Sequence, residues 1–211
     1  NDIVVTDNDQ FYIAAFKGIY VVEESTIVKQ FSVDQGLLDN MVNRLLLDEQ
    51  GNIWFGTYVG KGGGIGIIKD GLVKQTFQLE DGLVHDAITS ITQFSKTERL
   101  IGGGVYTVGG ANIISFEDNE WVIKESITLE DGLAGEKVRH IYIDTSERIW
   151  FCSEYDGIAI FSDLGVAKKI ITIADGLSDN EVKKIIEDDL GNLWMATRRG
   201  ITKFNKGVLI F

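Results

Sequence analysis

GLLDNMVNRLLLDEQGNIWFGT, residues 36–57, recurs near the end of the chain as GLSDNEVKKIIEDDLGNLWMAT, residues 176–197. The two segments align without a gap and share Gly, Leu, Asp, Asn, Val, Asp, Gly, Asn, Trp and Thr. A more divergent copy, GLAGEKVRHIYIDTSERIWFCS, begins at Gly132. Self-similarity at a fixed period is typical of repeat architectures, so the repeat indicates the fold before any single residue is interpreted.

The segments in and between these copies have the composition of short β-strands. They are rich in β-branched and aromatic residues and are interrupted by Gly, Asn and Asp, in a chain that has 24 glycines and no proline. Four such segments form one unit. The large apolar residue of each second segment recurs at spacings of 42, 46, 50 and 44 residues, at Tyr12, Trp54, Leu100, Trp150 and Trp194. A four-stranded unit with this period is typical of a β-propeller blade.

We therefore predict an all-β fold, a β-propeller built of four-stranded antiparallel blades. The 211 residues, 44% of them apolar, hold five blade units, at approximately 1–35, 36–81, 82–131, 132–175 and 176–211. Either five blades close on themselves or the chain is part of a larger ring. We favour the larger ring, because the chain opens and closes without linkers. An open arc would expose blade faces and strand edges, so we also expect self-association.

Two short motifs predict how the strands are joined. Asp48 and Asp188, each followed three residues later by glycine, predict a hairpin in which the carboxylate accepts backbone N–H groups. Asp-Gly-Leu, starting at residues 81, 131 and 175, predicts the link between blades, with its leucine plugging the blade edge. Calcium binding is the alternative for the aspartates, but turn capping is favoured because no dense D-x-D-x-D-G run is present.

Composition and motifs argue against several functions. The net charge of −12 disfavours nucleic acid and anionic membranes as partners, and no apolar run is long enough to span a membrane. The single cysteine, Cys152, lies in an apolar strand and is expected to be buried. His140 lies in a first strand, and His85, beside Asp86 in an inter-blade loop, is more typical of a solvated loop residue than of an acid–base catalyst. Without a nucleophile elbow or zinc-ligand spacing, we predict no catalytic residue, metal site or cofactor.

The loops that follow the second strands differ between units while the strands agree, which suits a constant scaffold with variable loops. We expect these loops at residues 16–17, 58–63, 106–110, 154–156 and 198–199. Tyrosines recur just past the second strand, and their flat faces could stack on sugar rings. The candidate ligand-binding residues are Tyr58, Lys61, His85, Tyr106, Glu154, Tyr155, Arg198 and Arg199. The alternative for each one is a solvated turn residue.

The quoted copies resemble the two-component regulator propeller repeat, which is found in extracytoplasmic sensing regions of bacterial sensor kinases and hybrid two-component systems. The resemblance implies a periplasmic or extracellular, non-catalytic sensor region that binds a small molecule or oligosaccharide at the loop face. It also implies rings of seven blades, from which five units depart. Two other functions stay open, namely a protein–protein interaction scaffold and a propeller lyase or hydrolase that uses His85.

Overall fold

The computed structural model describes residues 1–59, 61–163, 166–205 and 208–210. Gly60, in the predicted loop 58–63, and Phe211, at the end of the predicted last strand, lie outside the described residues. The chain divides into two compact units. The first unit comprises residues 1–101 and 112–125, and the second comprises residues 102–111 and 126–211.

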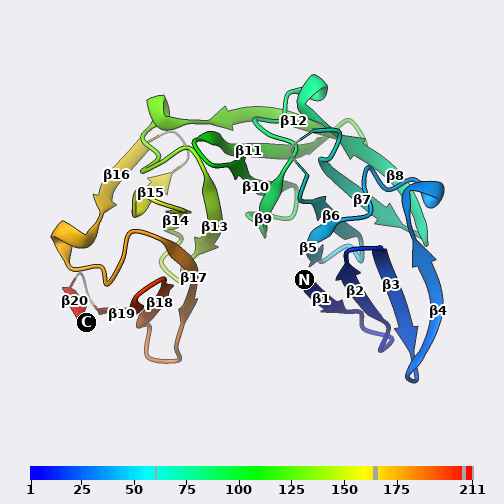
Figure 1. Cartoon of the computed structure of the whole chain (residues 1–211), viewed down its shortest axis with the longest axis horizontal. Helices are drawn as coiled ribbons and strands as arrows, with labels where there is room; N and C mark the ends of the chain where they lie inside the picture. Colours follow the sequence, from blue (N-terminus) through cyan, green and yellow to red (C-terminus); the bar gives the residue numbers. More distant parts are fainter. Residues whose placement is uncertain (60, 164–165, 206–207, 211) are drawn as a thin grey trace. The chain divides into compact units, whose positions relative to one another are not determined.

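Within the described residues the strands form five four-stranded sheets, and in each sheet neighbouring strands follow one another along the chain (Figure 1). The first three sheets contain β1 (Asp2–Val5), β2 (Phe11–Ala15), β3 (Gly18–Glu23) and β4 (Thr26–Phe31); β5 (Val42–Leu47), β6 (Ile53–Thr57), β7 (Ile65–Lys69) and β8 (Leu72–Phe77); and β9 (Ile88–Gln93), β10 (Glu98–Val105), β11 (Val108–Glu117) and β12 (Glu120–Ile127). The last two contain β13 (Val138–Ile143), β14 (Ile149–Ser153), β15 (Ile158–Asp163) and β16 (Val166–Ile171); and β17 (Val182–Glu187), β18 (Leu193–Thr197), β19 (Gly200–Asn205) and β20 (Val208–Ile210). The predicted all-β fold of antiparallel blades is confirmed.

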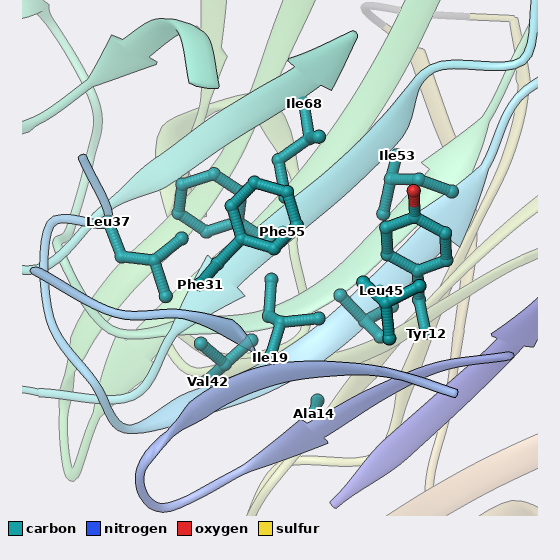
Figure 2. Close-up of a cluster of buried hydrophobic side chains, with 11 residues drawn as sticks. Tyr12, Ala14, Ile19, Phe31, Leu37, Val42, Leu45, Ile53, Phe55 and Ile68 are labelled. Carbon is teal, nitrogen blue, oxygen red and sulfur yellow. The ribbon is translucent and has the colours of Figure 1, made fainter. Parts of the chain in front are cut away.

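Apolar side chains of the first and second sheets form one core cluster in the first unit. Tyr12 and Ala14 of β2 and Ile19 of β3 pack with Leu45 and Phe55 of the second sheet (Figure 2). All five residues of β6 are buried, so this middle strand is covered on both faces. A strand covered on both faces can be apolar throughout, which explains why its sequence does not alternate.

The recurring tryptophans differ in burial. Trp54 and Trp150 are fully buried, and each meets another aromatic ring edge-on, Trp121 at 4.6 Å and Phe204 at 5.2 Å between ring centroids. Burying a tryptophan removes about 200 Å² from water and is worth on the order of 3 kcal/mol. Trp194, by contrast, is 36% exposed, so its position in the repeat does not by itself guarantee a buried ring.

Each link between sheets contains a short 3-10 helix that the sequence reasoning did not predict. The four helices are η1 (Val33–Gln35), η2 (Leu79–Asp81), η3 (Leu129–Asp131) and η4 (Ile173–Asp175). Each one ends at a glycine with φ between 98° and 108°, a conformation that glycine adopts without strain. The leucine after each glycine is 3–5% exposed, so the predicted plugging leucine is confirmed.

The predicted loop at residues 106–110 is wrong. The turn between β10 and β11 contains only Tyr106 and Thr107, and β11 begins at Val108. Glycines make this tight hairpin possible, because a Cβ on Gly104 would lie 2.6 Å from the carbonyl oxygen of Val108. Backbones can approach this closely only where no side chain intervenes.

Candidate functional site

An aspartate carboxylate fixes the hairpin that precedes each tryptophan strand, and it is buried at Asp48 and Asp144. Asp48 accepts the backbone N–H groups of Gln50 at 3.0 Å and Asn52 at 2.9 Å, as the sequence predicted. It also accepts the indole N–H of Trp54 at 2.9 Å, which was not predicted. Asp144 with Trp150 and Asp188 with Trp194 repeat this indole bond, both at 2.8 Å. The spacing of six residues between aspartate and tryptophan is the signal that could have revealed it.

Asp48 has a further partner from the third sheet. Arg99 of β10 donates to its Oδ2 at 2.9 Å, and both side chains are 0% exposed. The Arg99 guanidinium lies 4.8 Å from the Trp121 ring centroid. Burial raises the pKa of Asp48, but hydrogen bonds from Asn52, Trp54 and Arg99 outweigh that effect and hold the pKa below its ordinary value. The carboxylate is therefore a structural anion.

We use the name loop face for the residues that follow the second strand of each sheet. In the first unit this face carries two predicted site residues, Tyr58 and Lys61. The backbone N–H of Tyr58 donates to Met41 O at 2.9 Å, and Lys61 is exposed. The N–H of Gly62 donates to the Asp86 carboxylate at 3.0 Å, so this loop is held against the loop that bears His85.

His85 has a structural partner within its own loop. Its Nδ1 accepts the backbone N–H of Ala87 at 2.8 Å. Asp39 and Asp179 occupy the equivalent positions of other repeats, and each accepts the N–H two residues on, at 2.7 and 2.8 Å. His85 therefore replaces the aspartate that caps this turn elsewhere, and its Nδ1 lone pair is already engaged.

In the second unit the loop face contains a charged cluster around Glu154. Its carboxylate pairs with Lys137 at 3.1 Å and with Arg139, and the Lys137 and Glu154 side chains are only 7% and 12% exposed. Burial raises the pKa of Glu154, but the hydrogen bonds from Arg139 and Lys137 outweigh it and lower the pKa. Lys137 and Arg139 were not predicted as site residues, because nothing in the sequence links the start of a first strand to the end of the second.

In the last repeat two of these three positions exchange charge, since Glu181 replaces Lys137 and Arg198 replaces Glu154, while Lys183 keeps the positive charge of Arg139. Glu181 lies within 3.6 Å of Lys183 and 3.9 Å of Arg198, and Asp179 pairs with Arg199 at 3.2 Å. Arg198 and Arg199 are mostly exposed, so these pairs are open to water. The position equivalent to Tyr58 thus holds an acid, Glu154, in one repeat and a base, Arg198, in the next.

The two remaining candidates are exposed tyrosines of the second unit. Tyr155 is 49% exposed and directly follows Glu154. Tyr106 is 78% exposed, and its hairpin packs closely on the segment of Lys137, where a Cβ on Gly104 would lie 3.2 Å from the Lys137 Cα. The structure therefore places Tyr106 and Tyr155 on two segments that each adjoin the same charged cluster.

Metal and thiol chemistry find little support in the part of the chain that the structure describes. No group of three or more His, Cys, Asp and Glu side chains there could hold a metal ion. Cys152 is fully buried, and burial raises the pKa of its thiol well above the usual range. Among the described residues no helix is long and apolar enough to cross a bilayer.

Comparison with protein families identifies the repeat. Residues 36–59 and 176–199 match the model of the two component regulator propeller family. The two best-conserved copies of the repeat therefore match this family model, and the other three units lie outside the match. Comparison with curated proteins found no match.

Several solved structures share the fold. The extracellular domain of a hybrid two component system from B. thetaiotaomicron matches with a TM-score of 0.61 at 21% identity, over 96% of this chain and 32% of that domain. Streptogramin B lyase matches with a TM-score of 0.70 at 14% identity, over 99% of this chain and 66% of the lyase. A gluconolactonase from Xanthomonas campestris matches with a TM-score of 0.61 at 12% identity, over 95% and 70%. The chain thus spans about a third of the sensor domain, and these likenesses show the propeller fold alone.

Proposed function

We propose that this chain is a non-catalytic, ligand-sensing propeller region of a bacterial signalling protein, located outside the cytoplasm. Its ligand is a small molecule or oligosaccharide that binds at the loop face. Binding there would shift the arrangement of neighbouring domains or protomers, because a ligand increases the population of the conformation that it binds most tightly.

One observation carries the proposal. Two copies match the repeat of a sensor family, while the residue that follows the second strand changes from Tyr58 to Glu154 to Arg198 in equivalent positions. The side chains at these positions lie outside the apolar core clusters. Variation on a constant scaffold is what a recognition surface requires.

A saccharide array followed by titration calorimetry tests the proposal. We expect a saccharide that binds the wild-type chain and whose dissociation constant rises about tenfold in Tyr58→Ala or Arg198→Ala, equivalent to the loss of one good contact. Lys169→Ala, an exposed lysine of β16, is the matched control and should bind normally. Capture of a basic protein with no saccharide binding would favour an interaction scaffold instead.

The enzyme alternative can be tested at His85. If the chain turns over a lactone or a saccharide, His85→Ala removes both the imidazole and the cap of its turn, so a loss of turnover would be ambiguous. His85→Asp restores the cap in the form used at Asp39 and removes only the imidazole. Turnover that is lost in both variants would overturn the non-catalytic proposal.

A further inference from the structure

A cavity of about 500 Å³ opens in the first unit, at the end of β6 opposite to Tyr58. Its walls come from the turns before β6 and β10 and from strands β7, β8, β11 and β12. The lining residues that matter here are Asn52, Lys69, Lys74, Lys96, Phe116 and Trp121. Ligand pockets commonly have volumes of about 300–1,000 Å³.

One wall of the cavity is aromatic and held in place. Trp121 packs edge-on against the buried Trp54, and Phe116 leans on Trp121 at 5.2 Å between ring centroids. The Gln75 side chain donates to Trp121 O at 2.6 Å and accepts its N–H at 3.3 Å, which ties β12 to β8. The apolar wall therefore exists before any ligand arrives.

A buried acceptor in this wall lacks a partner. Asn52 is 5% exposed, and its Nδ2 donates to the Asp48 carboxylate at 2.9 Å. Its Oδ1 has no hydrogen-bond partner among the described residues. Leaving a buried carbonyl unpaired is unfavourable, so an O–H or N–H donor delivered by a ligand would be favourable there.

The charged side chains that line the cavity are all lysines. Lys69, Lys74 and Lys96 line it, and no ion pair joins any of them to a carboxylate in the described part of the chain. Glu49 and Asp70, which adjoin these turns, line a different cavity. Three unpaired ammonium groups in a chain with a net charge of −12 create a local attraction for anions.

We propose that this cavity binds an anionic ring compound. Its carboxylate or sulfate group meets the lysines, its flat face lies against Trp121 and Phe116, and a hydroxyl or N–H group donates to Asn52 Oδ1. The five residues of β6 separate this cavity from Tyr58 by about 17 Å, so this second site does not depend on the sensing role of the loop face. Acidic sugars and aromatic acids share the required chemistry.

Calorimetry with three probes tests whether the ligand must be an anion and distinguishes acidic sugars from aromatic acids. The probes are 4-nitrophenyl β-D-glucuronide, the neutral 4-nitrophenyl β-D-glucoside and 2-naphthoate. We expect at least one anion to bind about tenfold more tightly than the glucoside, and to weaken as salt is added. Tighter binding of the glucuronide identifies a sugar acid, and tighter binding of naphthoate an aromatic acid.

Substitution of the lysines then locates the site. Lys74→Gln and Lys96→Gln should each raise the dissociation constant of the anion about three- to fivefold, whereas Lys17→Gln, on the β2–β3 turn, should leave it unchanged. These exposed side chains can be changed without loss of the fold. Equal binding of the glucoside, no binding of either anion, or unchanged binding in both lysine variants would overturn the proposal.

Discussion

Arg99 joins the third sheet, which lacks the aspartate and tryptophan of the repeat, to the sheet that precedes it. The third sheet has Phe94 and Leu100 where its neighbour has Asp48 and Trp54. Instead of a second carboxylate, it supplies a cation to the carboxylate of the preceding sheet, across 51 residues of sequence. Two partly divergent repeats are thereby joined by a buried ion pair.

Removal of this cation should be costly. Arg99→Met leaves the buried Asp48 carboxylate without its counterion, and we expect a loss of about 3 kcal/mol in the free energy of unfolding. Urea denaturation measures it. Arg148→Met is the matched control, because Arg148 also pairs with an aspartate, Asp144, but its side chain is 38% exposed and its removal should cost no more than about 1 kcal/mol. Equal losses would contradict the role of burial.

Glu154 predicts a pH dependence of stability. Its folded pKa lies below the unfolded value of about 4.3, so its contribution is complete above that pH and is lost as pH falls through the lower folded pKa. We expect Glu154→Gln to be less stable than wild type at pH 7, by about 2 kcal/mol, because Lys137, only 7% exposed, loses the carboxylate that balances its charge. The difference should shrink as the pH falls below about 4.3 and through the lower folded pKa.

Urea midpoints measured across that range check this expectation. Glu130→Gln, which removes an exposed carboxylate of η3, should follow the wild-type curve throughout. A constant difference between wild type and Glu154→Gln from neutral to acid pH would show that the carboxylate does not stabilise the fold through its charge.

In three of the sheets a glycine at or just before the start of the third strand lies very close to the end of the fourth strand. Gly18, Gly64 and Gly157 have φ of 106°, 144° and 94°. A Cβ added to them would lie 1.9, 2.1 and 2.2 Å from the carbonyl oxygen that ends the fourth strand. The start of the third strand can lie this close to the end of the fourth only because the glycine has no side chain.

Gly18→Ala should therefore destabilise the first sheet by about 3 kcal/mol, since it combines backbone strain with a steric overlap. Gly51→Ala is the control, because Gly51 also has a positive φ, of 78°, but its added Cβ would meet nothing within 4 Å. We expect about 1 kcal/mol there. Thermal unfolding of the two variants separates the cost of backbone strain alone, in Gly51→Ala, from the cost of backbone strain combined with a steric overlap, in Gly18→Ala.

The strands were predictable because their signals are local. Asp48, Gly51 and Trp54 lie within seven residues, and their recurrence fixes where each hairpin turns. The 3-10 helices were missed because a three-residue helix leaves no periodic pattern to detect. The shortened turn at Tyr106 was missed because glycines are equally typical of loops and of strands that approach closely.

The candidate site was predictable only in part. Tyr58, Glu154 and Arg198 were found from their position after the second strand, but whether they bind a ligand is untested. Lys137 was missed because its partner Glu154 is brought to it by strand pairing, over 17 residues. Contacts of this kind depend on the folded register, which a single sequence does not state.

The last sheet exposes an apolar face. Ile186 is 55% exposed, Ile201 63% and Trp194 36%, and together with the Ala196 side chain they form one shallow apolar depression. In the other sheets the equivalent tryptophans Trp54 and Trp150 are covered. Exposed apolar surface of this kind favours association with another surface.

We therefore expect this chain to self-associate. Light scattering should give a mass that rises with protein concentration, and Ile186→Lys combined with Ile201→Lys should return it to that of one chain. Ile170→Lys, on β16 and 44% exposed, is the control and should behave as wild type. A wild-type mass that stays at one chain over a hundredfold range of concentration would contradict this expectation.

The buried pair of Arg99 and Asp48 also limits how such chains can be rebuilt. Blades with similar sequences could be exchanged in a redesigned chain. Separating the second blade from the third, however, would leave Asp48 buried without its cation in one place and Arg99 buried without its anion in the other. Recombination between copies must therefore keep these two blades adjacent and in order. A designer who shuffles the blades would have to move the two together.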